Sequence, residues 1–206
     1  AFDLSRRDFT INAMALTFEK DEPVIIDKYA SQLDLHEGVI KAVGDCKQRF
    51  TDDPLRILRA IRFTNKYDFK LENNLKGLLK KMRNKLFDVS VERWVQELDK
   101  ILMSANPDKG IDLLRTTGVL DIILPEVTHN NIYSRLTRTN DLDKRWKILL
   151  ENTGTTSSDE IEYEDEDLTI YKSIPNPQLT NYINRGICAR LKFSNARTKI
   201  ILGGNK

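Results

Sequence analysis

Residues 52–63 read DDPLRILRAIRF, and this stretch decides which fold the sequence predicts. The pair Asp53-Pro54 is typical of a helix start, because an aspartate caps the first turn and proline suits the first helical position. No helix breaker follows until about Asn65, so we expect a helix over this stretch. Its apolar and basic residues fall on different sides of such a helix: Ile57, Leu58 and Ile61 on one, Arg56, Arg59 and Arg62 on another.

Downstream of this helix, apolar residues keep three- and four-residue spacing, which predicts a mainly α fold. The polar and acidic stretch at about 154–170 predicts a loop instead. Further helices are expected over about 72–86, 90–104, 107–117, 142–150, 177–185 and 194–202. Upstream, three short apolar runs end in turn-prone residues and predict a small α/β segment: 11–18, 24–26 and 40–43.

The composition is that of a globular protein. The chain has 206 residues, of which 40% are hydrophobic and 31% charged, and its apolar stretches are too short to span a bilayer. The two cysteines, Cys46 and Cys188, lack companions at metal-ligand spacing, so we expect no structural zinc and a reducing compartment. We therefore expect a cytoplasmic protein, or a mitochondrial or nuclear one, with no membrane partner. Seven of the 31 acidic residues lie within 159–167, and the remaining basic excess would suit a phosphate-rich partner.

Arginine residues carry the strongest functional signal. A second arginine-bearing segment, RRDFTINA at 6–13, precedes the helix of residues 52–63. The planar guanidinium group can hold a phosphate or a base edge through two parallel hydrogen bonds. An amphipathic helix with arginines in water, or paired with Asp52 and Asp53, would explain the same pattern. A basic cluster further on has the same two explanations, an RNA backbone contact or a solvated helix face: Lys76, Lys80, Lys81, Arg83 and Lys85.

Both arginine segments resemble signature motifs of the class II tRNA nucleotidyltransferase and poly(A) polymerase family, which read RRDFTIN-A and E/D-D-x-x-R-x-x-R-A-x-R-F. Between them, residues 26–45 follow the connecting motif of the family, and GVLDIILPE at 118–126 matches its helical region. The resemblance covers about residues 1–127. It implies three parts: the end of a nucleotidyltransferase head domain over 1–46, a helical, RNA-binding neck with the nucleotide-selecting motif over 47–104, and a helical body over 105–206.

The resemblance implies template-independent addition of C and A nucleotides to tRNA 3′ ends, with ATP and CTP as substrates. Asp53 and Arg56 would select the base by its Watson–Crick edge. Cytosine and adenine present an amino donor beside an unprotonated ring nitrogen, whereas guanine and uracil present a carbonyl beside an N–H. A carboxylate acceptor beside an arginine donor matches the first pattern and opposes the second.

The other motif residues take roles by the same resemblance. Arg7 would contact the incoming nucleotide, and Asp8 would set the preference for ribose. Arg59 and Arg62 would steady the triphosphate or the selecting side chains. Asp52 stands where relatives often have glutamate, and we count it among the nucleotide-binding residues.

The resemblance also implies Mg²⁺ held by an Asp-x-Asp strand that lies N-terminal to the arginine motifs in the family. The Asp-x-Asp at 165–167 lies in the acidic stretch and lacks a Gly-rich loop or strand signal. We therefore expect no catalytic or metal-binding residues within this chain. We interpret it as a fragment that an N-terminal segment would complete and that adds no nucleotide alone. A poly(A) polymerase, an A-only or C-only enzyme, and a non-catalytic RNA-binding subunit of a split enzyme are the alternatives.

Overall fold

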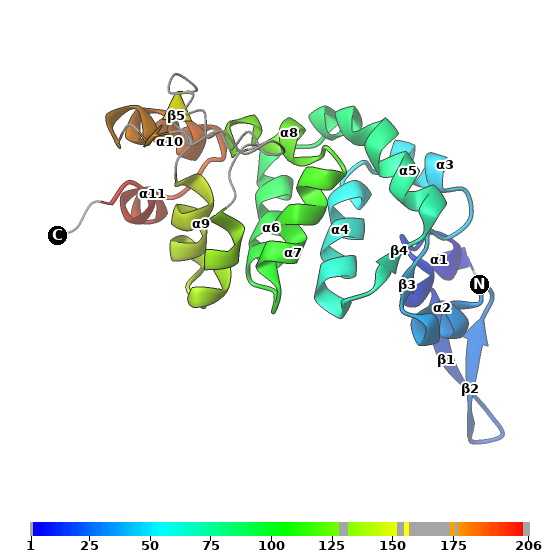
Figure 1. The fold of residues 1–206 in the computed structure, drawn as a ribbon. Helices are drawn as coiled ribbons and strands as arrows, with labels where there is room; N and C mark the ends of the chain where they lie inside the picture. The colour runs from blue at the N-terminus through cyan, green and yellow to red at the C-terminus, as the bar shows by residue number, and fades with distance from the viewer. Residues whose placement is uncertain (1, 128–131, 152–154, 157–173, 176, 204–206) are drawn as a thin grey trace, which may run out of the picture.

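The computed structural model of the protein describes residues 2–127, 132–151, 155–156, 174–175 and 177–203. Its helices follow one another along an elongated molecule, with a small α/β part at the N-terminal end (Figure 1). The predicted mainly α fold is therefore confirmed. Within the described residues, no helix is long and apolar enough to cross a membrane.

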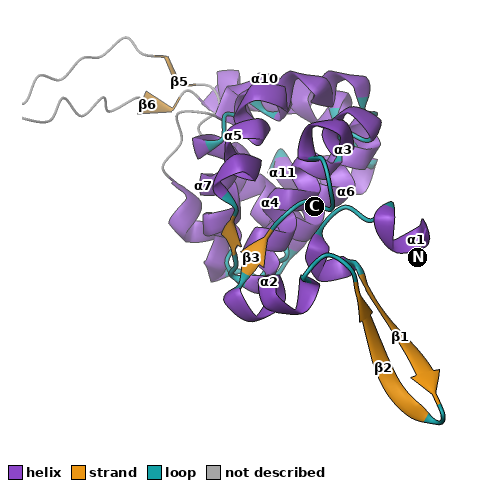
Figure 2. Ribbon diagram, turned by 90° about the vertical axis from the view of Figure 1, so that its right-hand side faces the viewer, coloured by secondary structure: helices purple, strands orange, loops and turns teal. Residues whose placement is uncertain are grey.

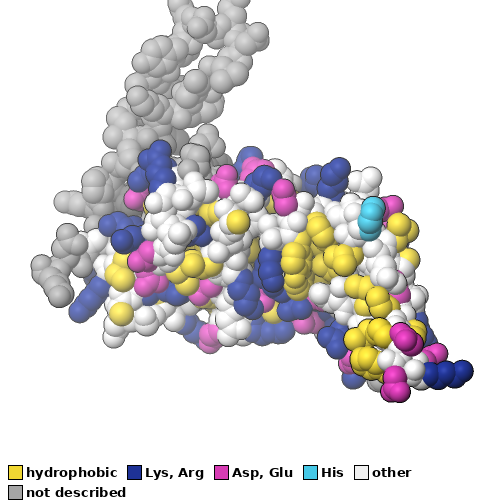
Figure 3. Space-filling view, turned by 90° about the horizontal axis from the view of Figure 1, so that it is seen from below, with side chains coloured by type: hydrophobic (Ala, Val, Ile, Leu, Met, Phe, Trp, Pro, Cys, Tyr) yellow, Lys and Arg dark blue, Asp and Glu magenta, His cyan; other side chains and the backbone are white. Residues whose placement is uncertain are grey.

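An antiparallel hairpin projects from the N-terminal part (Figures 1 and 2). It consists of β1 (Met14–Glu19) and β2 (Glu22–Asp27), whose register pairs Leu16 with Ile25. Side chains alternate between the two faces of a strand, so Leu16, Phe18 and Ile25 share one face. They are 61%, 66% and 51% exposed, and apolar side chains are visible together at this end of the molecule (Figure 3). No described residue covers this face.

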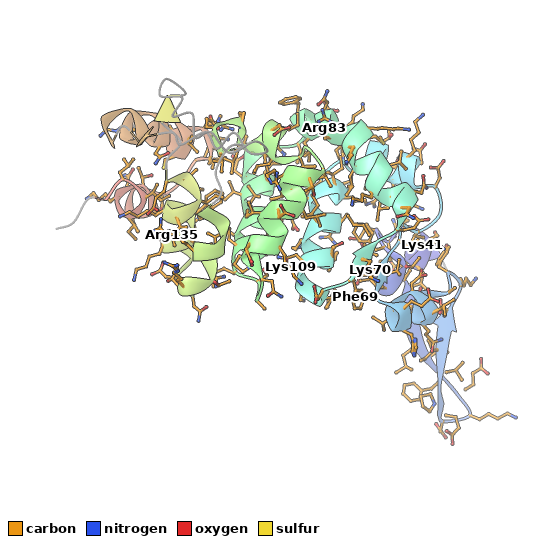
Figure 4. All side chains as sticks on the ribbon, viewed as in Figure 1. Lys41, Phe69, Lys70, Arg83, Lys109 and Arg135 are labelled. Atoms are coloured by element: carbon orange, nitrogen blue, oxygen red, sulfur yellow. The ribbon has the colours of Figure 1, made fainter. Side chains whose placement is uncertain are left out.

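Short elements connect the hairpin to the helices. They are α1 (Phe2–Ser5), η1 (Thr10–Asn12), α2 (Ser31–Glu37) and β3 (Val39–Ile40). β3 pairs in parallel with β4 (Lys70–Leu71), which lies beyond the next two helices in the sequence. Lys41 and Lys70 are exposed beside this pairing (Figure 4). The α/β part is thereby joined to the helical part at two distant points of the chain.

The arginine-rich stretch begins its helix later than the sequence predicts. α3 (Cys46–Asp52) is followed by a turn over residues 53–55, and α4 runs over Arg56–Tyr67. Asp53 is the C-cap of α3, since its backbone N–H bonds to the carbonyl of Arg49, and its own carbonyl accepts the N–H of Arg56 at 3.1 Å at the start of α4. Its Oδ1 nevertheless accepts a hydrogen bond from the N–H of Leu55 at 3.3 Å, as a cap would.

The remaining helices match the predicted spans closely. Residue Gly118, at φ +70°, follows α7 in the left-handed conformation that ends many helices. The acidic residues 157–173, including the Asp-x-Asp at 165–167, lie outside the described residues. The elements are α5 (Asn73–Met82), η2 (Arg83–Asp88), α6 (Val91–Leu102), α7 (Pro107–Thr116), α8 (Leu120–Ile123), η3 (Pro125–Val127), η4 (Ile132–Arg138), α9 (Leu142–Leu150), β5 (Thr155–Thr156), β6 (Ile174–Pro175), α10 (Pro177–Arg190) and α11 (Asn195–Ile201).

The core places α4 between the α/β part and the next helices. Ile57, Leu58 and Ile61 of α4 are fully buried, as the sequence predicts for that side of the helix. Gly110 of α7 allows a close approach, since a Cβ atom there would lie 2.5 Å from Ile101 of α6 and 2.6 Å from Asn65 of α4. Because this side of α4 is packed in the core, Arg56 and Arg59 lie on the side that remains partly exposed.

Candidate nucleotide-binding site

An ion pair joins the two arginine motifs. Asp8, which is 7% exposed, accepts hydrogen bonds at its Oδ2 from Nε and Nη2 of Arg59 at 2.8 and 2.6 Å. Its Oδ1 accepts from the N–H of Phe9 at 2.9 Å and from Asn12 at 3.2 Å. Burial by itself would raise the pKa of Asp8, but the hydrogen bonds and charge of Arg59, together with the hydrogen bonds from Asn12 and Phe9, lower that pKa below its ordinary value. Asp8 is therefore a carboxylate held inside the junction.

Two further arginines tie the first motif to the helices through its backbone. Arg56 donates from Nη2 to the carbonyl of Arg6 at 3.1 Å and from Nη1 to the carbonyl of Arg49 at 3.0 Å. Arg49 itself donates to the carbonyl of Ser5 at 2.5 Å. Arg56 is only partly buried and keeps further N–H donors. It lies at the point where the two motifs meet.

The backbone N–H of Arg56 donates to the carbonyl of Asp53 at 3.1 Å at the start of α4, but their side chains do not bond to each other. The carboxylate of Asp53 faces Arg93 of α6, whose Nη2 lies 3.2 Å from both of its oxygens. The side chain of Asp53 is 31% exposed, so another donor can still reach it. The structure thus brings a partly exposed acceptor and a partly exposed donor to the same edge of α4.

The remaining motif residues divide between surface and interior. Arg7 is exposed and pairs with Asp3 at 2.6 Å, and Asp52 is exposed and accepts from Gln48 at 2.7 Å. Arg62, by contrast, is 12% exposed in its side chain and pairs with Glu97 of α6 at 2.5 Å. Its interior position suits a brace between α4 and α6 better than a direct contact with a ligand.

Arg93 and Glu97 also belong to this site, although no sequence motif indicates them. Both lie in a predicted helix, four residues apart and therefore on one face. Glu97 is 2% exposed, and it also accepts a hydrogen bond from Lys100 at 2.9 Å. A glutamate between the buried residues Val95 and Leu98 was the signal available in the sequence, because a buried carboxylate requires a partner.

Metal-ligating groups do not come together here. No set of three or more His, Cys, Asp or Glu side chains could hold a metal ion among the described residues. The carboxylate of Asp8 is already paired with Arg59. A further Asp-x-Asp, at Asp141 and Asp143, serves the fold, since Asp141 caps α9 and Asp143 pairs with Arg197 at 2.7 Å. The described residues therefore do not form a binding site for the Mg²⁺ that the resemblance implies.

Comparison with known protein families finds two matching profiles. The poly(A) polymerase head domain matches residues 1–41, and the probable RNA and SrmB-binding site of polymerase A matches residues 68–130. The candidate site described above contains Arg7 and Asp8 of the first matched region and Arg93 and Glu97 of the second. The two profiles therefore bracket α3 and α4.

Curated relatives and solved structures agree with these profiles. A CCA-adding enzyme of Pediococcus pentosaceus is 40% identical over 115 residues, 56% of this chain and 28% of the relative. A multifunctional CCA protein of Neisseria gonorrhoeae is 44% identical over 127 residues, 61% and 30% respectively. The chain thus spans less than a third of the length of these relatives.

The fold comparisons cover nearly all of the chain. A CCA-adding enzyme in complex with ATP superposes with a TM-score of 0.69 and 28% identity, covering 97% of this chain and 45% of that one. The Bacillus stearothermophilus CCA-adding enzyme in complex with CTP shares the fold at a TM-score of 0.75 and 24% identity, covering 98% and 46%. Profiles, relatives and solved structures thus agree that this chain is similar to the tRNA nucleotidyltransferase and poly(A) polymerase family.

Proposed function

We propose that this chain supplies the nucleotide-selecting and tRNA-binding part of an enzyme that adds C and A to tRNA 3′ ends. The observation that supports this most is the junction of the two motifs. Arg56 bonds to the backbone of Arg6, next to Arg7, while Asp53 lies partly exposed at the same end of α4. A nucleotide at this junction would meet both motifs. ATP and CTP, the ligands named for solved relatives, are the proposed substrates.

Selection rests on the donor and acceptor pattern of the two side chains. The Asp53 carboxylate accepts only, and the Arg56 guanidinium donates only. An amino group bonded to Asp53 and an unprotonated ring nitrogen bonded to Arg56 satisfy cytosine and adenine. Uracil and guanine would place a carbonyl against the carboxylate and an N–H against the guanidinium. Because mismatched polar groups would lose their water without gaining partners, such bases are rejected strongly.

The other residues of the motifs would support this reading. Arg7 is exposed and free to turn from Asp3 toward the nucleotide, since a surface ion pair holds it only weakly. Arg59 is one-third exposed and could share its guanidinium between Asp8 and a phosphate. In our proposal Asp8 sets the ribose preference through the position of this arginine, Asp52 adds an acidic group beside Asp53, and Arg62 keeps α4 in place.

Contacts to the tRNA backbone would come from basic residues of the neck. Lysines and an arginine of α5 and η2 provide cations without base specificity: Lys76, Lys80, Lys81, Arg83 and Lys85. Such contacts position a nucleic acid and weaken as salt concentration rises. In our proposal, phosphoryl transfer depends on carboxylates outside this chain, and the residues described here bind, orient and select.

Single-nucleotide addition by the full-length protein tests this proposal. The substrate is a tRNA that ends before CCA, offered CTP, UTP, ATP or GTP separately. We expect Arg56→Ala to lower the preference for CTP over UTP by about a hundredfold, because the paired donor is lost. Arg115→Ala is a matched control, since Arg115 is an exposed arginine of α7 paired with Asp112 at 2.7 Å. An unchanged preference in Arg56→Ala would count decisively against the proposed selection.

A poly(A) polymerase is the second candidate, because both matching profiles are described for that enzyme. The same assay separates the two by product: a single CCA end from tRNA nucleotidyltransferase, a run of A from a polymerase. An A-only or C-only enzyme would stop at one nucleotide type. Residues 1–206 alone are expected to add nothing. Nucleotide addition by this chain alone would show that it holds its own catalytic carboxylates.

A further inference from the structure

A pocket of about 190 Å³ lies between the C-terminal end of α4 and the first turns of α7. It is at the opposite end of α4 from the candidate nucleotide-binding site, because the helix rises by about 14 Å between Arg56 and Asn65. Lys109, at the pocket, lies at the edge of the molecule opposite Arg83 (Figure 4). The residues used below line the pocket from the two helices: Thr64, Asn65, Asp68, Lys109, Asp112 and Leu113.

The mouth of the pocket favours positive charge. Asp68 accepts a hydrogen bond from Nζ of Lys109 at 2.9 Å, and Asp112 accepts one from Nη2 of Arg115 at 2.7 Å. The hydrogen bond and charge of Asp68 raise the pKa of Lys109 above its ordinary value, so this ammonium group stays charged. Asp68 is also the C-cap of α4, and the carbonyl end of a helix favours cations. Both carboxylates at the mouth therefore already hold a cation of the chain itself.

Inside the pocket, two oxygens await a hydrogen-bond partner. Asn65 is 7% exposed, and its Nδ2 donates to Oγ of Ser104 at 2.6 Å. Ser104 uses its single hydroxyl proton on the carbonyl of Ile101 at 2.7 Å, so it can only accept from Asn65, and this fixes the orientation of the amide. Among the described residues, Oδ1 of Asn65 and Oγ1 of Thr64 are buried without a hydrogen-bond partner. Such groups are costly unless a donor reaches them.

The chemistry of these groups determines the class of ligand. Asp68, Asp112 and Asn65 offer acceptor oxygens, and Leu113 adds an apolar surface. An ammonium group matches this set, because it has donors only, whereas a phosphate or a carboxylate would be repelled by the two aspartates. The volume is below the roughly 300–1,000 Å³ of pockets for drug-sized ligands, so it suits an ammonium group on a short alkyl chain.

We propose that this pocket binds a primary alkylammonium group, supplied by a linear polyamine or by a lysine side chain of a partner, and that Lys109 competes with this ligand. The incoming ammonium replaces that of Lys109 at Asp68, and its alkyl chain lies against Leu113. Asn65 and Thr64 are reached once the side chain of Lys109 has turned outward. Lys109 is 60% exposed, and an exposed ion pair holds it only weakly. The proposal is independent of nucleotide selection at the start of α4.

Calorimetric titration of the full-length protein with spermidine tests the proposal, at low ionic strength and without tRNA or nucleotide. We expect saturable binding that Asp68→Asn weakens by at least about fivefold, because a charged partner is lost. Asparagine tolerates the left-handed backbone of Asp68, at φ 55°, so this variant should fold. Lys109→Met should instead strengthen binding about threefold, because the competing ammonium group is removed.

Thr64→Val tests the interior of the pocket. Valine keeps the shape of threonine without the hydroxyl, so spermidine should bind about tenfold more weakly. The melting temperature without ligand should stay the same or rise, because the buried hydroxyl lacks a partner among the described residues. A purely structural role of Thr64 would lower the melting temperature and leave binding unchanged, which would contradict the proposal.

Matched controls lie away from the pocket. Asp88→Asn removes an exposed aspartate paired with Lys85 at 3.7 Å, and Lys199→Met removes an exposed lysine of α11. Neither should change spermidine binding. Replacing the acidic residues of 159–167 by amides should also leave it intact, although that stretch is strongly acidic.

A second titration identifies the source of the ammonium group. N-acetyl-lysine amide represents a lysine side chain of a partner, and tighter binding of spermidine than of this compound would identify a polyamine. Equal binding of the two would identify a lysine side chain. The proposal is overturned if neither compound binds, if Asp68→Asn binds like wild type, or if Lys109→Met binds more weakly. Loss of binding on neutralising residues 159–167 would overturn it as well.

Discussion

Replacing Asp8 with asparagine should weaken the junction of the two motifs in a pH-dependent way. The variant removes the charge that faces Arg59 and turns one acceptor oxygen into an NH₂ group. That NH₂ group must then face other donors, because both oxygens of Asp8 accept hydrogen bonds. Hydrogen bonds to charged groups contribute about 1.5–3 kcal/mol each. Arg59 is 32% exposed and recovers part of the loss from water, so we expect a total loss of about 2–3 kcal/mol at pH 7.

The pH dependence follows from the lowered pKa of Asp8. Burial opposes ionisation, but the bonds from Arg59 lower this pKa below its ordinary value. A carboxyl group whose pKa is lower in the folded state stabilises the fold above its unfolded pKa, near about 3.9. That contribution disappears as the pH falls through the folded pKa. The difference in stability between wild type and Asp8→Asn should therefore be full at pH 7 and shrink below about pH 4.

Urea unfolding at several pH values between 7 and 3 measures this difference directly. Asp121→Asn is a suitable control, because Asp121 is an exposed aspartate of α8. Its unfolding curve should follow that of wild type at every pH. A stability gap for Asp8→Asn that keeps the same size from pH 7 to pH 3 would refute the reasoning, as would the lack of any gap.

Three further variants test the packing of the helices. Gly110→Ala should destabilise the protein by about 1–2 kcal/mol, because the new methyl group overlaps Ile101, a clash that exceeds the gain in helix propensity. Gly77 lies in a helix with open space around it, so Gly77→Ala should instead stabilise the protein by about 0.5–1 kcal/mol. If thermal unfolding showed both substitutions stabilising or both destabilising the protein, this account would be contradicted. Arg145 is 4% exposed and donates to the carbonyls of Ser104 and of Leu102 at the end of α6. Arg145→Ala should lower the free energy of unfolding, measured in urea, by about 3 kcal/mol or more. A decrease below about 1 kcal/mol would argue against the role of Arg145 in this packing.

Local patterns predicted most of the helices but not their contacts. The periodic spacing in residues 52–63 is a property of one segment, so the buried and basic sides of α4 could be read from sequence. The exact start of α4 could not, since it depends on the turn between the end of α3 at Asp52 and Arg56. The two-residue pairing of β3 with β4 is too short to leave a pattern and joins segments about 30 residues apart.

The same limit applies to the candidate site. Asp53 and Arg56 were identified through motifs in which the relevant residues are close in sequence. Arg93 and Glu97 pair with residues 40 and 35 positions away, and no spacing rule connects such distant side chains. Their interaction with α4 depends on how two helices pack, which is a property of the folded molecule. The interior position of Arg62 was missed for the same reason.

Helix α6 also reaches the C-terminal part of the molecule. At its far end, Asp99 accepts from Trp146 at 2.6 Å and pairs with Arg197 at 3.2 Å. Its 12 residues span about 18 Å, so one helix contacts both Asp53 and the C-terminal helices. If the proposed function holds, a substitution near Trp146 would shift α6 and change the selection of nucleotides without altering any of the proposed nucleotide-binding residues.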